Sequence, residues 1–160
     1  MNRIIAITLL SAALVTPALA EDWATSAPTT PFYAGVQVGD ATSVLGGYQI
    51  DKMFSAELMH SKYNEYATSL GIFGVANFPL SLKNALPLSL FAKVGLVRTT
   101  VDYRYWCGTG FNCTYTDSTT DLAWGGGAQY EINKRFSARA GINFGKYKNS
   151  DVYVGGIIRF

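Results

Sequence analysis

The sequence predicts an all-β protein, an eight-stranded, antiparallel, up-and-down transmembrane β-barrel. Three observations lead to this fold class. Apolar residues recur at every second position in eight segments, which is the period of a strand. Charged residues make up only 15% of the chain and aromatic residues reach 14%, whereas a soluble domain carries roughly 25% charged residues. After residue 20, no apolar run approaches the roughly 20 residues of a spanning helix, so any membrane crossing would use strands.

The first 20 residues have the pattern of a secretory signal peptide. Arg3 supplies one positive charge, residues 4–15 form an almost unbroken apolar run, and an Ala-Leu-Ala triplet ends at Ala20. A transmembrane anchor is the alternative interpretation, but a run of about a dozen residues is shorter than a spanning helix requires. We therefore expect the signal peptide, residues 1–20, to be cleaved after Ala20 during export.

Residues 21–31 carry two prolines and show no periodicity, which indicates a short N-terminal leader. The predicted β-barrel domain follows over residues 32–160. Its alternating segments, with the polar residues of their less apolar face, are in order 32–40 (Gln37), 43–50 (Gln49), 53–63 (Glu57), 68–78 (Asn77), 87–104 (Lys93), 119–132 (Gln129 and Glu131), 135–147 (Arg139 and Asn143) and 150–160 (Arg159). An even number of strands of roughly ten residues is the pattern of an antiparallel barrel.

The connections between these segments alternate between two ends of the predicted barrel. Asp51-Lys52, residues 79–86 and Asn133-Lys134 fall at the end rich in Tyr, Phe and Ile. The other end holds three short connections and one long segment, residues 104–118, which we expect to be a loop. With both termini on the periplasmic side, as in membrane barrels of this kind, the long loop would face outward.

The glycines indicate which face of the strands lines the lumen. Ten of the sixteen glycines fall on the more polar face, and an eight-stranded barrel has barely room for its own side chains. Glycine suits the crowded side, so we expect the polar face inside and the apolar face outside. A soluble barrel such as a lipocalin shows the same alternation with its apolar face inside. In such a soluble barrel the polar face would be the water-facing surface, and that surface would need more than the five charged residues that these strands carry on it.

Those five charges form the most informative set in the sequence, and they are Glu57, Lys93, Glu131, Arg139 and Arg159. Inside a narrow barrel an unpaired charge would cost several kcal/mol, so we expect the five to pair with one another. A static polar plug is the favoured interpretation, because eight strands leave no aqueous channel by default. The alternative is a small gated pore that opens when the ion pairs exchange partners.

The last segment carries a family resemblance. Residues 151–160 place apolar or small residues at every second position and end on Phe160. This ending resembles that of bacterial outer-membrane β-barrels of the OmpA-like and opacity-porin type. The resemblance implies location in the cell outer membrane and recognition of Phe160 as an insertion signal by the barrel-insertion machinery, with periplasmic chaperones as earlier partners. It also implies contact with outer-membrane lipids and lipopolysaccharide.

The same resemblance extends to the charges inside the barrel. The transmembrane domain of OmpA-type proteins carries interior salt bridges among a Glu on strand three, a Lys on strand five, a Glu on strand six and an Arg on strand seven. Carried over by strand and lumen position, these become Glu57, Lys93, Glu131 and Arg139. The match covers residues 32–160 and rests on pattern alone. The peptidoglycan-binding domain that follows the barrel in that family is absent from this sequence.

Two cysteines lie in the predicted long loop. Cys107 and Cys113 are six positions apart and flank two glycines, which in an exported protein indicates a disulfide that closes a small loop. A metal site would need more ligands than the sequence offers nearby. The disulfide would hold Trp106, Phe111 and Tyr115 on an outward-facing tip. These aromatic residues suit either a binding surface for an extracellular ligand or an interfacial aromatic belt.

Other aromatic and cationic residues fit the two edges of a membrane. One predicted girdle, at the end where the chain terminates, consists of Phe32, Tyr48, Phe54, Phe78, Tyr130, Phe136 and Phe160. Candidates for the other girdle are Tyr63, Tyr66, Tyr103, Tyr105 and Trp124. His60, Lys62 and Arg98 have lipid-face parity near the outer end. There they could meet lipopolysaccharide phosphates or rise above the membrane into water.

We expect no enzymatic activity and no cofactor. Lipid A deacylases and palmitoyltransferases of this size use a His with a Ser and an acidic residue. Here the only histidine is His60, followed by Ser61, with no acidic residue evidently placed to orient it. The net charge of +2 gives no reason to expect nucleic-acid binding. The sequence therefore predicts a structural and surface-interaction protein, with a gated pore or, less favoured, a lipid A-modifying enzyme as alternatives.

Overall fold

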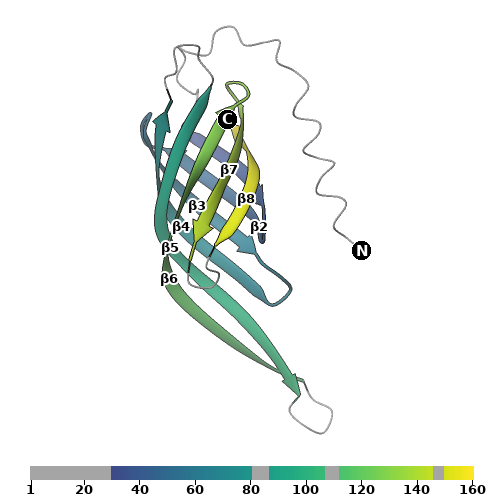
Figure 1. Cartoon of the computed structure of the whole chain (residues 1–160). Coiled ribbons are helices and arrows are strands. Elements are labelled where there is room, and N and C mark those ends of the chain that lie inside the picture. The colour runs from purple at the N-terminus through teal and green to yellow at the C-terminus, as the bar shows by residue number, and fades with distance from the viewer. Residues whose placement is uncertain (1–29, 81–86, 107–111, 146–149) are drawn as a thin grey trace.

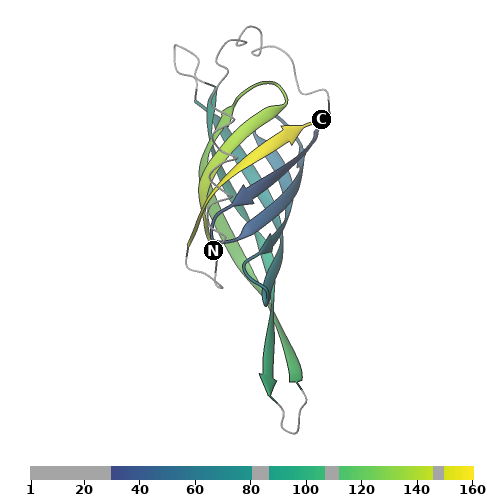
Figure 2. The ribbon, with the colours of Figure 1, turned by 90° about the vertical axis from the view of Figure 1, so that its right-hand side faces the viewer.

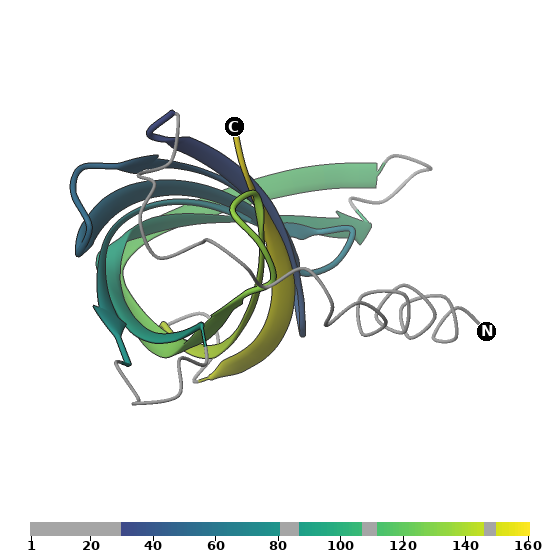
Figure 3. The ribbon, with the colours of Figure 1, turned by 90° about the horizontal axis from the view of Figure 1, so that it is seen from above.

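The computed structural model describes residues 30–80, 87–106, 112–145 and 150–160. Eight antiparallel strands follow one another around a single closed barrel, and β8 pairs with β1 to complete it (Figures 1 and 3). The strands are β1 (Phe32–Val38), β2 (Thr42–Gln49), β3 (Phe54–Lys62), β4 (Ala67–Pro79), β5 (Leu88–Trp106), β6 (Asn112–Glu131), β7 (Phe136–Phe144) and β8 (Asp151–Arg159). This confirms the predicted fold class. Among the described residues, no helix is long and apolar enough to cross a membrane.

The strands point their apolar face outward, as the glycine argument predicted. Leu58, Ile72 and Leu122 are each more than half exposed on the outside of the barrel, whereas Phe73 and Val75 inside it are almost fully buried. Every buried residue of the described part carries an odd number. Because neighbouring strand residues point to opposite faces, this uniform parity means that each described turn preserves the register of the lumen face.

Glycine on the lumen face makes room for large interior side chains. A Cβ atom added to Gly47 would lie 2.1 Å from the ring of Tyr33, which projects from the neighbouring strand β1. A Cβ atom on the next residue, Gly46, would meet nothing within 4 Å, because that residue faces outward. The contrast between adjacent positions confirms that the polar, glycine-rich face is the crowded one.

Two turns at the end of the barrel where the chain terminates share one design. The Asp51 carboxylate accepts hydrogen bonds of 2.7 Å from the backbone N–H groups of Met53 and Phe54. The side chain of Asn133 accepts two bonds of 2.8 Å from the N–H groups of the residues two and three positions later. Asp and Asn favour turns through this bonding to their own backbone. The turns fix the β2–β3 and β6–β7 connections predicted from the sequence.

The opposite end of the barrel corrects one prediction. Residues 104–106 belong to β5 and residues 112–118 to β6, so most of the expected 104–118 loop is a β-hairpin. Paired positions continue from Val101↔Asp117 to Trp106↔Asn112, and the hairpin projects well beyond the barrel wall (Figures 1 and 2). The segment lacks an apolar stripe, but it is rich in Thr and Tyr, which are enriched in strands. Trp106 and Tyr115 therefore lie on strands, and Phe111 lies outside the described residues.

Candidate functional site

An ion pair crosses the centre of the lumen. Arg139 Nη1 on β7 donates to Glu57 Oε1 on β3 over 2.6 Å, and both side chains are almost completely shielded, with exposed fractions of 2% and 0%. In a closed barrel of eight strands, β3 and β7 are four strands apart and thus stand opposite each other. The pair therefore joins two opposite walls of the barrel.

Neighbouring polar groups complete the hydrogen bonding around this pair. Gln129 Oε1 accepts from Arg139 Nε at 3.1 Å and from Nη2 at 3.0 Å. The Tyr33 hydroxyl donates to Glu57 Oε1 at 2.9 Å and lies 3.1 Å from the hydroxyl of Ser55. A buried ion pair is tolerated when further hydrogen bonds satisfy its remaining atoms. One oxygen of Glu57, Oε2, still has no hydrogen-bond partner among the described residues.

Lys93 occupies the same interior without joining the hydrogen-bonded pair. It is buried on β5, and its ammonium has no hydrogen-bond partner among the described residues. The nitrogen instead lies 4.9 Å from the centre of the Phe73 ring and 5.0 Å from that of Tyr153. These distances are within the range of a cation–π contact. Lys93 is thus held by aromatic faces close to the central ion pair.

The remaining two charges of the predicted set form a separate pair. Arg159 Nη2 donates to Glu131 Oε1 over 3.0 Å, with side chains 17% and 32% exposed. Both residues end their strands at the rim where the chain terminates. The expected single network of five charges is therefore corrected to a central pair, a rim pair and one lysine against aromatic rings. The prediction failed because alternation shows which face of a strand a residue occupies but not how deep in the lumen it lies. Gln49, predicted on the polar face that lines the lumen, donates to the Asp51 carbonyl at the rim instead.

Large apolar side chains also fill the lumen, and sequence reasoning missed them. They form one buried cluster of Tyr33, Leu45, Met59, Phe73, Val75, Phe91, Ala123, Tyr153 and Ile157. The Phe91 ring packs 4.5 Å from the guanidinium carbon of Arg139. The sequence did contain a signal for them: these residues have odd numbers, as Glu57 and Lys93 do, and therefore point to the same face of their strands. Treating the inner face as polar hid the fact that aromatic rings surround its charges.

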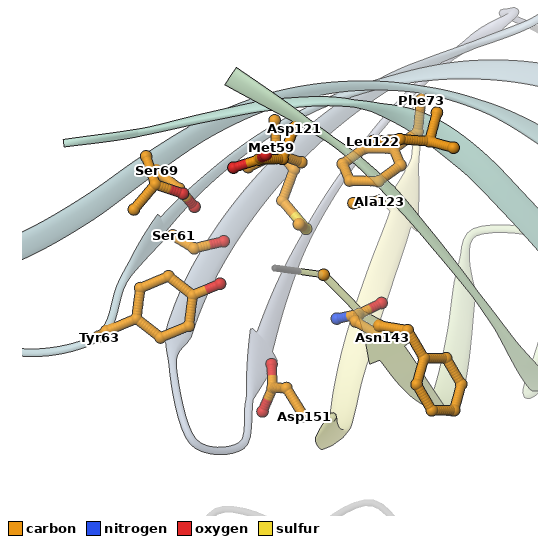
Figure 4. A pocket seen from close by; sticks show the side chains of 14 residues that line it. Met59, Ser61, Tyr63, Ser69, Phe73, Asp121, Leu122, Ala123, Asn143 and Asp151 are labelled. Carbon is orange, nitrogen blue, oxygen red and sulfur yellow. The ribbon is translucent and has the colours of Figure 1, made fainter. Parts of the chain in front are cut away.

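A small pocket opens at the mouth of the lumen nearest the hairpin. Its cavity volume of about 50 Å³ is room for a few water molecules. Ser61, Tyr63, Asn143 and Asp151 point into the shared space from separate strands and turns (Figure 4). Tyr63, expected in an outer aromatic girdle, instead lines this pocket because its odd parity turns it inward. Among the described residues, no three His, Cys, Asp or Glu side chains gather as a metal site.

The projecting hairpin presents a different surface. Tyr103 and Tyr115 are register partners on β5 and β6, and each is more than half exposed. Pairing of β7 with β6 begins only at Trp124, so β6 has no described partner on that side from Asn112 to Ala123. Cys113 is not a free cysteine. Its predicted partner Cys107 lies outside the described residues, so that disulfide stays a prediction.

The outward face carries aromatic residues at the rim where the chain ends. The seven residues of the predicted girdle are all exposed: Phe32, Tyr48, Phe54, Phe78, Tyr130, Phe136 and Phe160. Phe32 and Tyr48 meet edge to face with ring centres 5.2 Å apart. Toward the hairpin end, the rings of Trp124 and Phe144 stack at 4.3 Å. Aromatic residues therefore mark both ends of the apolar band.

The three basic residues of the outward wall lie on the two strands that flank β4. His60 and Lys62 on β3 and Arg98 on β5 are all exposed. Ser61 points the other way, into the lumen, where its hydroxyl lies 2.8 Å from that of Ser43. His60 and Ser61 thus stand on opposite faces of the strand. The structure does not bring together the base and hydroxyl that the enzyme alternative would require.

The chain matches no protein-family model and no curated protein. Solved structures do resemble it in shape. The N-terminal β-barrel domain of Pseudomonas aeruginosa OprF superposes with a TM-score of 0.63 at 15% identity, covering 81% of this chain and 95% of that one. This is the fold of the small outer-membrane β-barrels. Neisserial surface protein A, NspA, covers 82% of this chain and 98% of its own with a TM-score of 0.55 at 16% identity.

The comparison with a designed barrel shows that this fold does not by itself imply an activity. A de novo transmembrane β-barrel superposes with a TM-score of 0.57 at 17% identity, covering 84% of this chain and 98% of the design. An outer-membrane barrel fold is thus reached by designed and natural sequences alike. The comparisons establish the architecture, and function has to be argued from the site. Residues 1–29 lie outside the described residues, so the signal peptide and nearly all of the leader stay predictions.

Proposed function

We propose that the protein is a non-enzymatic outer-membrane β-barrel with a plugged lumen that presents the β5–β6 hairpin as a surface-interaction element. The membrane location is supported by the exposed apolar band between two sets of aromatic residues. Strands β7 and β8 are nine residues long, close to the roughly 9–11 residues of a spanning strand. The rim with the tight turns and Phe160 faces the periplasm, and the hairpin faces outward.

The hairpin is the single observation that carries the interaction role. Its strands leave the barrel and still pair in register as far as Trp106↔Asn112, so that the hairpin projects past the end of the barrel (Figure 2). Exposed tyrosines provide large contact area at a small entropy cost, and the open edge of β6 can accept an added strand. We propose that the partner is an extracellular protein segment that adds to this edge beside Tyr103 and Tyr115.

The plug is supported by the contents of the lumen. Glu57, Lys93 and Arg139 are at most 3% exposed, and aromatic rings pack around them. A chain of water through this layer would have to displace the central ion pair. We propose that the plug is static and stabilises the barrel. In planar bilayers, the purified protein should then show no conductance above that of protein-free membranes.

A specific observation favours the gated pore as a second candidate. Glu57 Oε2 and Lys93 Nζ are both buried and both lack a hydrogen-bond partner among the described residues. If Glu57 turned from Arg139 toward Lys93, an ion pair would be exchanged without a net loss of charge pairing. Conductance bursts that disappear in Lys93→Met, with Arg159→Gln as the rim control, would support the pore and contradict the static plug.

The interaction role is tested with protein refolded into lipid nanodiscs. Faster migration of the unboiled than of the boiled protein on a gel first establishes the folded barrel. Immobilised extracellular-matrix proteins are then the probes. The wild type should bind at least one of them, and Tyr103→Ser/Tyr115→Ser should reduce that binding severalfold. Tyr130→Ser is the matched control, because it removes an exposed tyrosine from the opposite rim. Equal loss in the control, or no wild-type binding, contradicts the proposal.

A further inference from the structure

The outward wall of the barrel carries its charge on one side only. Among the described strand residues that face outward between the hairpin and the opposite rim, the basic ones are His60, Lys62 and Arg98. All three lie on the consecutive strands β3 to β5 and at the hairpin end of the apolar band. Strands β1, β2, β7 and β8 carry no outward charge in their described parts. The asymmetry indicates a local site and not a general polar rim.

The register places these residues in two adjacent rows. His60 and Arg98 are both partners of Leu70, which lies between them on β4. The next row toward the hairpin runs from Lys62 through Thr68 and Thr100 to Ser118. Strands lie about 4.8 Å apart. The backbones of Lys62 and Thr100 are thus separated by roughly 10 Å, a span that long cationic side chains can share.

A hydrogen bond directs Arg98 toward the second row. Its Nη2 donates to the Ser118 hydroxyl over 3.1 Å, and Ser118 is the register partner of Thr100. The guanidinium therefore leans toward the hairpin and toward β6. It reaches the row of Lys62 at Ser118, three strand spacings or roughly 14 Å from the Lys62 backbone. Thr68 and Thr100 lie between the two cations. The nearest outward acid on these strands, Asp102, accepts a hydrogen bond of 2.6 Å from Thr116.

Directly below these rows, the surface is apolar. Leu58, Ile72 and Leu96 occupy successive strands in the next row toward the centre of the band, and each is more than half exposed. A ligand here would meet hydrocarbon on one side and two cations on the other. That combination matches a phosphorylated lipid, whose acyl chains lie in the apolar band while its phosphate sits at the band's edge.

We propose that Lys62 and Arg98, with His60 beside them, bind the phosphate of a phosphorylated lipid headgroup in the outer leaflet. The phosphate would lie over Thr68 and Thr100, between the Lys62 ammonium and the Arg98 guanidinium. The inference rests on the proposed membrane placement, because that placement puts the rows at the outer leaflet. It goes beyond that placement by assigning one side of the barrel a lipid of defined charge.

The test uses the mature protein in detergent and a variant that removes both fixed cations, Lys62→Gln/Arg98→Gln. Lys52→Gln/Lys134→Gln is the matched control, since it removes two exposed cations from turns at the opposite end. Lipopolysaccharide, the same lipid after enzymatic removal of its phosphates, and inorganic phosphate are the titrants. Binding is followed by isothermal titration calorimetry. Both variants are first checked for the faster migration of unboiled protein on a gel.

We expect lipopolysaccharide to bind the wild type and the control equally, and the double variant roughly fivefold or more weakly, as loss of two solvent-exposed charge contacts implies. Dephosphorylated lipid should bind all three proteins weakly. Equal weakening in the control, or unchanged binding of dephosphorylated lipid, overturns the lipid site. Inorganic phosphate binding as tightly as the lipid overturns it in favour of a free-anion site. Failure to fold in detergent would instead overturn the membrane placement itself.

Discussion

The lumen and the projecting hairpin are built from the same strands in two different ways. Strand β5 places Lys93 inside the closed barrel and, ten positions later, Tyr103 on the hairpin. Inside the barrel, each strand has a partner on both sides and its inward side chains meet residues from distant parts of the chain. In the hairpin, beyond Asp102, the described partners of β5 belong to β6 alone.

This difference teaches where sequence change is tolerated. Closure pairs the backbone hydrogen-bonding groups of every barrel strand. It also packs the lumen so closely that adding one methyl group to an inward side chain is destabilising. The hairpin depends on local cross-strand pairs, which contribute roughly 0.2–1 kcal/mol each. The barrel therefore sets the stability of the molecule, while the hairpin can vary in sequence at small cost. The proposed surface-interaction role falls in the region on which closure of the barrel does not depend.

The largest effect is expected from breaking the central ion pair. Arg139→Met keeps much of the side-chain length but leaves the Glu57 carboxylate buried without its cation. Removing one partner of a buried pair costs about 3–5 kcal/mol. The free energy of unfolding, measured by urea titration of the protein in lipid vesicles, should fall by that amount. The double variant Glu57→Gln/Arg139→Met should recover a large part, because no charge remains unpaired. A loss below about 1 kcal/mol for Arg139→Met alone would contradict the central role of the pair.

A smaller effect should follow from filling the space beside Tyr33. In Gly47→Ala, the new methyl group must displace the Tyr33 ring, whose hydroxyl bonds Glu57. Overpacking of this kind costs about 1–3 kcal/mol. Gly46→Ala is the matched control one residue away, and its methyl group enters open space on the outer face. The same urea titration should show Gly46→Ala within about 0.5 kcal/mol of the wild type. Similar losses for both variants would mean that the lumen face is no more crowded than the outside.

Trimming the hairpin should cost less than either change inside the barrel. Asp102 and Thr116 are register partners, so an Asn-Gly turn in place of residues 103–115 can join them as a two-residue hairpin. The trimmed protein should keep its faster unboiled gel migration and lose about 1 kcal/mol or less of unfolding free energy. Four described cross-strand pairs disappear, but the entropy cost of ordering their residues disappears with them. Loss of the folded gel band would show that the hairpin is part of the barrel's folding unit.

Much of this architecture follows from the sequence because a barrel repeats one simple rule. Alternation with a period of two predicted all eight strands to within a few residues at most ends, and the glycines predicted the inward face. The hairpin was missed because Thr-rich strands in water need no apolar stripe, so residues 112–118 carry no periodic signal. Aromatic girdles were predictable only where parity was followed, which is why Tyr63 was misplaced.

The candidate site was less predictable, for two physical reasons. Alternation tells which face a charge occupies but not its height in the barrel, so Glu131 and Arg159 could not be separated from Glu57 and Arg139. Contacts between opposite walls depend on the shear of the closed sheet, and no local pattern encodes them. The pairing of Glu57 with Arg139 therefore needed the structure, although both residues were already identified by charge and parity.

The smallest effect, from the rim ion pair, gives the sharpest test of the contrast between interior and periphery. Glu131 and Arg159 are joined at 3.0 Å, a distance comparable to that of the central pair, but their side chains remain 17% to 32% exposed. Water and salt screen such a pair, whose expected contribution is about 0.2–1 kcal/mol. Glu131→Gln should cost no more than this in the urea titration. The cost should vanish as NaCl is raised from about 0.05 M to about 1 M, because the screening length then falls to about 3 Å.

The Arg139→Met loss should persist over the same range of salt, because the side chains of the central pair are almost completely shielded from solvent. If Glu131→Gln proved as costly as Arg139→Met and equally insensitive to salt, depth in the barrel would not determine the value of an ion pair. The two regions would then be parts of one continuous plug. If Arg139→Met costs more than Glu131→Gln and only the latter depends on salt, burial inside the closed sheet, and not charge alone, makes the Glu57–Arg139 pair important for stability.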